Sequence, residues 1–462
     1  MIRGAACFRK LFQSSALSSK VAARYYTAQA AAHPGIFSSD EESADIDWDN
    51  LGFKLMQTDY MYVTKSSDDG IFRQGQLNRY GNIQLSPSAG VLNYGQGLFE
   101  GTKAYRREDG RIFLFRPQQN AIRMQIGAER MCMAAPSTDQ FVDAVKQTAL
   151  ANKRWIPPPG KGSLYIRPLL IGTGPILGLA PAPEYTFLVY ACPVGNYFKQ
   201  GTAPLNLYVE EDVHRASRGG AGGVKSITNY APVLKAMKNA KAQGYSDVLY
   251  LDAVNKKYIE EVSSCNIFLV KGNVLSTPIA KGTILEGVTR KSIMDIALDL
   301  GYTVEERLIE ADELISADEV FCTGTAVGVA PVGSITYKGQ RIEYKISPDL
   351  TCKQFYSRLV GIQREVPSRV LDEVEGNHNM NVPSSSPTYN IVNDIVEDIV
   401  IPQPQGDVID SDAIDSDTGM NEQPEEVDEV KLENHVNNDA DGDHDVPILQ
   451  QHEELDEQMH VL

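Results

Sequence analysis

The chain of 462 residues lacks several features that often reveal the class of an enzyme. Its six cysteines form no C-x-x-C pair, which argues against a metal site, a redox dithiol or a disulfide framework. We expect buried, reduced thiols instead. No run of about 18 apolar residues is present, so no transmembrane helix is predicted. No stretch rich in Lys and Arg suggests a nucleic-acid surface.

Histidine is also scarce in the part of the chain that can form a core. Five of the seven histidines lie beyond residue 364 and His33 lies near the N-terminus, which leaves only His214 between them. Ser-His-Asp hydrolysis, histidine-ligated zinc and Cys-His chemistry are therefore disfavoured. If this region is an enzyme, a group other than imidazole moves its protons, and lysine is the leading candidate.

The net charge of −18 is distributed unevenly along the chain. Residues 364–462 carry 26 acidic and 3 basic side chains, which leaves 40 basic and 35 acidic ones in residues 1–363. The acidic segment has few aromatic residues, so we predict that 364–462 is a mostly disordered tail. Within it, Ile391–Val400 places apolar residues at near-helical spacing. A short helix that binds a protein partner and an inert solvated extension both remain open.

The first 40 residues have the composition of an organellar transit peptide, which we predict to be disordered. Residues 1–39 contain no Asp or Glu, but have five basic residues among Ser and Ala. Ala23–Thr27 places an Arg before aromatic and small residues, as at many mitochondrial processing sites. We therefore predict a mitochondrial location. The serine pairs of this segment also suit a chloroplast peptide, so that alternative stays open.

Between these ends the pattern indicates mixed α and β structure. Helices are predicted over 120–132 and 137–152, where Ser137 and Gln140 suit a capping box. Apolar strands are predicted over 164–171 and 185–194. The polar, glycine-bearing stretch 195–204 suits an interdomain linker. We therefore predict a small N-terminal domain over 45–194 and a large domain over 205–363.

The second half of this region combines hairpins with single helices, as an α+β fold with mixed sheets does and a doubly wound parallel sheet does not. The predicted elements are a strand at 205–213, a glycine loop, a helix at 230–243, hairpins turning at 255–256 and 271–273, and a helix at 288–300.

Lys225 follows the glycine pair Gly222–Gly223, with Tyr230 five positions later and Glu261 further along the chain. A lysine can form a Schiff base with a carbonyl cofactor, and a phenol and a carboxylate can complete the cradle. On its own, however, a lysine after two glycines is more often a solvated turn residue.

Three further segments could bind an anion. Gly287–Arg290 lies where a turn enters a helix, so free backbone N–H groups could hold a phosphate. Gly324–Ala326 follows a strand and offers a hydroxyl, and Arg123 lies in a predicted helix. Taken singly, these segments are equally well explained as a helix start, a loop and a surface arginine.

Taken together and in order, these segments resemble one family. Positions from about 45 to 363 resemble branched-chain amino acid aminotransferases of the plant type, which are fold-type-IV pyridoxal-phosphate enzymes. This resemblance implies a two-domain fold with mixed and antiparallel sheets flanked by helices, and a homodimer. The matching segments are Asn93–Arg106, Leu164–Pro168, Gly222–Lys225, Glu261–Asn266, Gly287–Arg290 and Gly324–Ala326.

The resemblance implies pyridoxal 5′-phosphate as cofactor and assigns its contacts. Lys225 would form the Schiff base and then move the proton between the substrate Cα and the cofactor. Tyr230 would hydrogen-bond the phenolic oxygen, and Glu261 would keep the pyridine nitrogen protonated. The remaining implied contacts are Arg123, the amides of Val288 and Thr289, and Thr325 for the phosphate, with Ser264 as a supporting hydroxyl.

The same resemblance implies reversible transamination between L-leucine, isoleucine or valine and 2-oxoglutarate, in biosynthesis or degradation. Tyr94 and the turn of Thr325 and Ala326 would receive the α-carboxylate. A site that takes both apolar and acidic side chains needs an apolar wall beside one cation. The residues implied for that wall and cation are Phe99, Tyr165 and Arg167.

Two other functions remain open. A D-amino acid aminotransferase or an aminodeoxychorismate lyase would share the fold, although Leu98–Arg106 and Tyr165–Pro168 favour the L-branched-chain type. An interaction protein on an inactive enzyme scaffold would explain the acidic tail, but the intact lysine, tyrosine and carboxylate argue against it.

Mammalian relatives have a C-x-x-C pair where this chain has Val327–Ala330, so that mode of thiol regulation is not available here.

Overall fold

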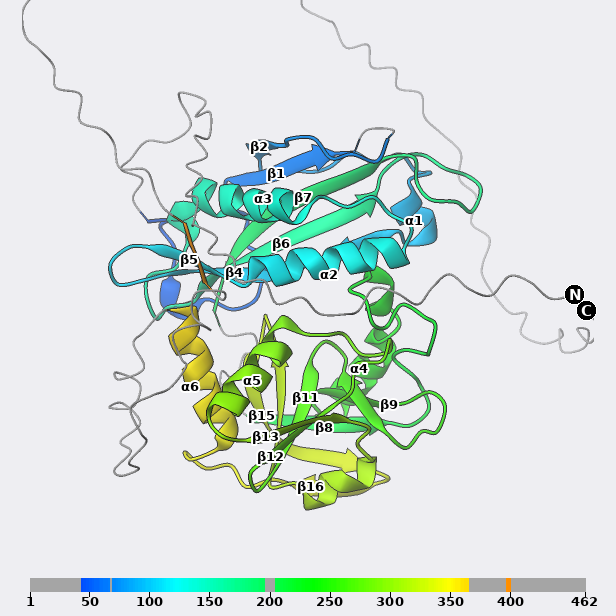
Figure 1. Ribbon diagram of the computed structural model, residues 1–462, viewed down its shortest axis with the longest axis vertical. Coiled ribbons are helices and arrows are strands. Elements are labelled where there is room, and N and C mark those ends of the chain that lie inside the picture. Colours follow the sequence, from blue (N-terminus) through cyan, green and yellow to red (C-terminus); the bar gives the residue numbers. More distant parts are fainter. Residues whose placement is uncertain (1–42, 67–68, 196–203, 365–395, 400–462) are drawn as a thin grey trace, which may run out of the picture. The chain divides into compact units, whose positions relative to one another are not determined.

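The computed structural model describes residues 43–66, 69–195, 204–364 and 396–399, which all lie within one compact unit, Met1–Pro402. Two sheets with flanking helices form this unit (Figure 1), which confirms the predicted α+β fold with mixed sheets. Among the described residues, no helix is long and apolar enough to cross a membrane. The predicted transit peptide lies outside the described residues.

The first sheet has eight strands in the order β17-β5-β4-β6-β7-β1-β2, with β3 paired to β6. Its strand pairs are antiparallel. The central pair β6–β7 is buried along most of its length, because both strands are almost entirely apolar. The strand bounds are β1 (Tyr60–Lys65), β2 (Gln76–Arg79), β3 (Gly97–Phe99), β4 (Thr102–Arg106), β5 (Ile112–Phe115), β6 (Ser163–Gly172) and β7 (Tyr185–Val194).

Three helices accompany this sheet: α1 (Gly90–Tyr94), α2 (Pro117–Arg130) and α3 (Thr138–Ala151). The predicted capping box is present, since Ser137 Oγ accepts from the Gln140 amide at 3.2 Å and the Gln140 side chain accepts from the Ser137 amide at 2.9 Å. Phe141 of α3 packs against Phe187 of β7 with ring centroids 5.7 Å apart. In Figure 1, α2 and α3 lie in front of β6 and β7.

The second sheet has nine strands in the order β10-β9-β8-β15-β14-β11-β12-β13, with β16 paired to β15. It is mixed, because β8–β9, β8–β15 and β12–β13 are parallel and the others antiparallel. Its bounds are β8 (Leu205–Glu210), β9 (Asp247–Leu251), β10 (Ile259–Val262), β11 (Asn266–Lys271), β12 (Val274–Pro278), β13 (Thr303–Arg307), β14 (Glu319–Gly324), β15 (Gly328–Tyr337) and β16 (Gln340–Glu343).

The helices of this half are α4 (Leu234–Ala242), α5 (Val288–Asp299) and α6 (Thr351–Gln363). The predicted hairpins are confirmed as β9–β10 and β11–β12. The first strand, predicted to reach residue 213, ends at Glu210 because the amides of Asp212 and Val213 bind the Glu210 carboxylate and turn the chain. A 3-10 turn over Ile227–Asn229 precedes α4, which begins later than predicted.

A shared apolar cluster joins the two sheets. Tyr105 and Phe115 of the first sheet pack with Phe268, Phe321 and Phe355 of the second half. The rings of Phe268 and Phe321 are stacked with centroids 5.0 Å apart. The chain passes from one sheet to the other within 195–204, where we predict the interdomain linker. The division into domains at that point stays a prediction.

The acidic tail contributes one strand, β17 (Val396–Ile399), to the first sheet. It pairs antiparallel with β5, from Val396 opposite Phe115 to Ile399 opposite Ile112, and is the orange strand in Figure 1. The helix considered for this stretch is therefore wrong for residues 396–399. A short isolated helix is only marginally stable in water, whereas the edge of β5 offers a row of backbone hydrogen-bond partners. The rest of the tail lies outside the described residues.

The expected burial of the cysteines is confirmed for four of the five described ones and wrong for Cys132, which is exposed. Cys132 lies in the turn after α2 and has a φ of 52°. This left-handed turn directs the chain toward α3 and leaves the thiol at the surface. The sequence pattern of α2 continues through Cys132, so the predicted helix extends two residues beyond its observed end at Arg130.

Candidate active site

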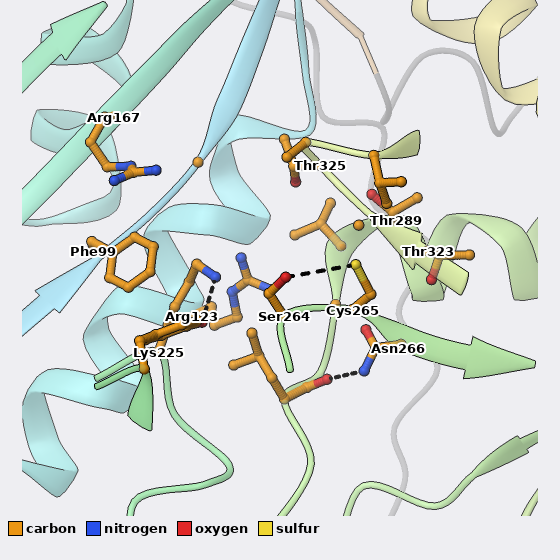
Figure 2. A pocket seen from close by; sticks show the side chains of 18 of the residues that line it. Phe99, Arg123, Arg167, Lys225, Ser264, Cys265, Asn266, Thr289, Thr323 and Thr325 are labelled. Carbon is orange, nitrogen blue, oxygen red and sulfur yellow. Dashed lines mark hydrogen bonds between the residues drawn. The ribbon is translucent and has the colours of Figure 1, made fainter. Parts of the chain in front are cut away.

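A cavity of about 530 Å³ lies among residues from both sheets. Figure 2 shows the side chains that converge on it from β3, β6, α2 and the loops of the second sheet. Twelve of the thirteen predicted site residues line this cavity: Phe99, Arg123, Tyr165, Arg167, Lys225, Tyr230, Glu261, Ser264, Val288, Thr289, Thr325 and Ala326.

The amine of Lys225 lies 3.0 Å from the hydroxyl of Tyr230, close enough for a hydrogen bond. The same amine lies 4.5 Å from the ring centroid of Phe99, whose ring is 4.9 Å from that of Tyr230. The amine is therefore in contact with a phenol and an aromatic face. No carboxylate is hydrogen-bonded to this amine in the described part of the chain.

The loop that carries Lys225 is fixed by Asn229, a residue that our sequence reasoning missed. The Asn229 side chain donates to the carbonyls of Ala221 and Val224, both at 2.8 Å. Gly222 is needed for a close approach, because a Cβ there would lie 2.6 Å from the carbonyl oxygen of Thr283. The glycines before the lysine therefore let the loop pack directly against the 282–283 turn.

Glu261, on β10, lines the cavity and is 2% exposed. Its carboxylate forms a 2.7 Å ion pair with Arg215 and accepts from the Leu285 amide at 3.0 Å. Burial raises the pKa of Glu261, and Arg215 opposes that rise. Arg215 was not predicted from the sequence, because no local pattern connects it to β10, which lies much further along the chain.

Arg123 of α2 is paired with Glu100, which is completely buried. Two hydrogen bonds of 2.8 and 2.7 Å join its Nε and Nη2 to the two oxygens of Glu100, and Nη1 donates to the carbonyl of Glu286 at 3.0 Å. A guanidinium has five N–H groups, so two remain for an anion. Glu100 fixes the orientation of Arg123 and was also missed from the sequence.

The N-terminus of α5 offers the backbone donors of an anion site. Gly287 precedes the helix, and a Cβ there would lie 2.2 Å from Oδ1 of Asn266. The first amides of a helix, here those of Val288 and Thr289, have no intrahelical acceptor. Nearby, the buried hydroxyl of Thr323 has no hydrogen-bond partner within the described ranges. Thr289 and Thr323 both line the cavity (Figure 2).

Arg167 lies between two aromatic rings on the opposite wall. Its guanidinium carbon is 4.8 Å from the centroid of Phe99 and 5.2 Å from that of Tyr165. Its Nη2 donates to the Tyr165 hydroxyl at 3.1 Å, and its buried Nε has no partner among the residues that the structure describes. This wall is largely apolar but contains one cation with donor capacity left.

Lys103 of β4 supports the turn that contains Ala326. Its amine donates to the Ala326 carbonyl at 3.3 Å, and burial lowers the pKa of Lys103 to about 8. This lysine belongs to the recognised segment Asn93–Arg106, but nothing in the local pattern indicated that it contacts a turn in the other half of the chain.

Tyr94 is the one predicted site residue that does not line this cavity. It ends α1, and its hydroxyl donates to the carbonyl of Leu177. Leu177 and Leu179 on the same loop are 91% and 85% exposed. Within one chain, Tyr94 therefore lies beside an exposed apolar loop instead of at the cavity.

Ser264 and Cys265 complete the site between β10 and β11. The Ser264 hydroxyl lies 3.9 Å from the Cys265 sulfur (Figure 2). Burial raises the pKa of the Cys265 thiol to about 12, so it stays neutral and is a poor nucleophile. In the described ranges, no cluster of three or more His, Cys, Asp or Glu side chains could hold a metal ion.

Residues 97–335 match the family model of class IV amino-transferases. The chain is 67% identical over 345 residues to a chloroplastic branched-chain-amino-acid aminotransferase 2 of Arabidopsis thaliana. The matched region covers 73% of this chain and 89% of that relative. The chain belongs to the branched-chain amino acid aminotransferases. The mitochondrial branched-chain-amino-acid aminotransferase 1 of Arabidopsis thaliana is 66% identical to this aminotransferase, over 71% of this chain and 86% of the relative.

A solved branched-chain aminotransferase with norvaline, from the archaeon Thermoproteus uzoniensis, resembles this aminotransferase with a TM-score of 0.57 and 27% identity, over 68% of this chain and 97% of that one. Another solved branched-chain amino acid aminotransferase, 26% identical with a TM-score of 0.58, contains pyridoxamine 5′-phosphate. Class IV aminotransferases use pyridoxal 5′-phosphate, and the residues of this cavity fit it. The Lys225 amine is hydrogen-bonded to a phenol, and a buried carboxylate lines the cavity. A buried hydroxyl without a partner in the described ranges, that of Thr323, lines the same cavity as the first residues of α5.

Proposed function

We propose that this enzyme transfers the amino group between L-leucine, L-isoleucine or L-valine and 2-oxoglutarate, in both directions. The observation that carries this proposal is Arg167, a single cation between the rings of Phe99 and Tyr165 in the cavity that contains Lys225. An aliphatic side chain packs against the rings, and the side-chain carboxylate of glutamate pairs with the guanidinium. One wall therefore serves both substrates.

When bound, pyridoxal 5′-phosphate supplies a carbonyl carbon for the amino group and a ring that accepts electrons as the substrate loses its Cα proton. Lys225 would bond the cofactor and, once released, would move that proton as general base and acid. Tyr230, 3.0 Å from the amine, would hold the phenolic oxygen, and Glu261 would keep the ring nitrogen protonated. Arg215, 2.7 Å from Glu261, opposes the rise in its pKa that burial causes and so favours the charged carboxylate that this role needs.

The phosphate would be held by the two free N–H groups of Arg123, the Val288 and Thr289 amides and the Thr325 hydroxyl, with Ser264 in support. The helix N-terminus and the guanidinium both favour an anion. The charge of Arg123 is offset by Glu100, so it contributes mainly directed hydrogen bonds. The α-carboxylate of the substrate binds at the turn of Thr325 and Ala326, which Lys103 supports.

We also propose that the enzyme is a homodimer, because Leu177 and Leu179 form an exposed apolar loop of the kind that a subunit interface covers. Tyr94, hydrogen-bonded to this loop, is then placed to reach the substrate of the neighbouring subunit.

For location we propose an organelle, and among organelles the mitochondrion. The chloroplast is the alternative. A fluorescent protein fused after residue 40 tests this by its distribution in plant cells.

Purified enzyme should convert L-leucine and 2-oxoglutarate to the branched 2-oxo acid and L-glutamate. Failure of 2-oxoglutarate as acceptor would overturn the proposed reaction, and preferential use of D-alanine would support the D-amino acid alternative. Lys225→Ala should lose both turnover and the covalent, borohydride-reducible cofactor bond. A retained bond in that variant would assign the bond to another lysine.

A further inference from the structure

A second cavity, of about 140 Å³, lies apart from the active site and shares no lining residue with it. It is bounded by the β9–β10 turn, the end of β12 and the glycine loop before Lys225. The turn over 281–283 forms part of its wall, and Thr283 is the residue against which Gly222 packs. This cavity is therefore next to the loop that holds the catalytic lysine.

Glu260 lies in this cavity with an unsatisfied carboxylate. It is 8% exposed, and its Oε1 accepts from the Thr283 hydroxyl at 2.6 Å. Its Oε2 is buried and has no hydrogen-bond partner in the described part of the chain. Burial raises the pKa of Glu260, as expected for a carboxylate that lacks a donor. Glu260 lines this second cavity, whereas its neighbour Glu261 lines the active-site cavity, so the two carboxylates serve different cavities.

The other carboxylate of the cavity is already occupied by the protein. Asp252 accepts hydrogen bonds from the backbone amides of Asn255, Lys257 and Tyr258 at 2.7, 3.0 and 2.8 Å. It therefore shapes the β9–β10 turn and does not compete with Glu260. An incoming donor, ideally a cationic one, would satisfy the free oxygen of Glu260.

The remainder of the cavity combines two exposed cations with apolar walls. Arg218 and Lys281 line it and are exposed at the surface. The apolar contacts come from Val254, Ile279 and Leu308. A carboxylate near the cations, an ammonium at Glu260 and a short hydrocarbon side chain between them would match all three features.

We propose that this cavity binds a free aliphatic α-amino acid as its zwitterion. The ammonium bonds Oε2 of Glu260, the carboxylate faces Arg218 and Lys281, and the side chain lies against Val254 and Ile279. The site is distinct from the substrate site, because its walls belong to other residues. Its occupant contacts the 281–283 turn on which the lysine loop rests.

Hydrogen exchange measured by mass spectrometry tests this on the full-length enzyme in its pyridoxamine phosphate form, with which L-valine cannot react. L-valine at millimolar concentration should slow exchange in peptides covering 252–260 and 278–284. Glu260→Gln should weaken this protection about tenfold or more, because it removes the charged acceptor. Glu108→Gln, a change at an exposed carboxylate outside the cavity, is the matched control. Transamination by Glu260→Gln should stay unchanged.

The two ends of the ligand are tested separately with isobutylamine and 3-methylbutanoate, each of which should protect much less than L-valine. The proposal would be overturned if either compound slowed exchange as much as L-valine does, or if L-valine slowed exchange equally in Glu260→Gln and in the wild type. It would also be overturned if L-valine did not slow exchange in these peptides at all. If Glu260→Gln fails to fold, the double variant Arg218→Met and Lys281→Met examines the carboxylate end by the same measurement.

Discussion

Two charged side chains near the active site have different surroundings. Glu261 is buried but paired with Arg215 at 2.7 Å, whereas Lys103 has only the Ala326 carbonyl at 3.3 Å as a hydrogen-bond acceptor. Burial shifts the pKa of both groups toward the neutral form, but Arg215 opposes this shift at Glu261, whereas burial alone sets the shift at Lys103. We therefore expect the removal of these two charges to have distinct effects.

Glu261→Gln should lower kcat by about 100-fold or more, because the cofactor ring nitrogen loses the carboxylate that keeps it protonated. It should also lower stability by about 3 kcal/mol, because Arg215 is left buried without its partner. Steady-state kinetics at saturating cofactor and thermal unfolding test both effects. Glu260→Gln, which changes the neighbouring carboxylate that lines the second cavity, is the control. Equal loss of kcat in both variants would contradict this role for Glu261.

Lys103→Met should change how stability depends on pH. The folded pKa of Lys103 is about 8 and the unfolded value is 10.5, so between these values the unfolded chain binds more protons than the folded one. Wild-type stability should therefore rise, relative to the variant, as pH increases from 8 to 10.5, by about 1–3 kcal/mol. Urea unfolding of both proteins across this range measures the difference. A constant difference would mean that Lys103 is already freely solvated.

At the scale of elements, α5 depends on a glycine at its start. A Cβ at Gly287 would lie 2.2 Å from Oδ1 of Asn266, whose amide donates to the Leu285 carbonyl at 2.8 Å. Gly287→Ala should displace Asn266 and the helix N-terminus, with a loss of about 1–3 kcal/mol and weaker cofactor binding. Thermal unfolding and cofactor titration test this. Gly52→Ala, where a Cβ would meet nothing within 4 Å, should leave both unchanged.

The pairing of β17 with β5 leads to another prediction. Glu397→Pro removes a backbone donor from β17, so amide exchange in Ile112–Phe115 should become faster as the edge of β5 opens. Glu433→Pro, elsewhere in the acidic tail, is the matched control. Unchanged exchange in β5 would mean that its amides do not depend on the tail.

Elements whose formation depends on neighbouring residues could be predicted from the sequence, whereas contacts between segments far apart in the chain could not. The capping box at Ser137 and the bounds of β7 depend on neighbouring residues, and both were predicted correctly. Twelve predicted site residues line one cavity because the recognised segments are ordered along a shared fold. The partners Glu100 and Arg215 were missed because no spacing rule connects them to Arg123 and Glu261. β17 was missed because its pairing depends on an edge formed elsewhere.

At the scale of the whole molecule, the described lining of the active site contains no residue of the acidic tail. Every described residue that lines its cavity precedes 328, and the last described helix of the second half ends at Gln363. Truncation after Gln363 should therefore leave kcat and KM for L-leucine within about twofold of wild type, since no interaction with the transition state is removed. The same chain should show faster amide exchange in β5. Loss of turnover in the folded truncated enzyme would give the tail a direct catalytic role.

The exposed thiol of Cys132 is a position at which this protein can be labelled. Among the described cysteines it alone is exposed, whereas burial raises the pKa values of Cys192, Cys265, Cys322 and Cys352. A maleimide dye should thus label Cys132 selectively once Cys7 is replaced by serine, because only an accessible thiolate reacts quickly. Since no cysteine follows position 352, a second dye could be introduced at a chosen point of the tail. Energy transfer between the two would report, one molecule at a time, when the tail leaves the sheet.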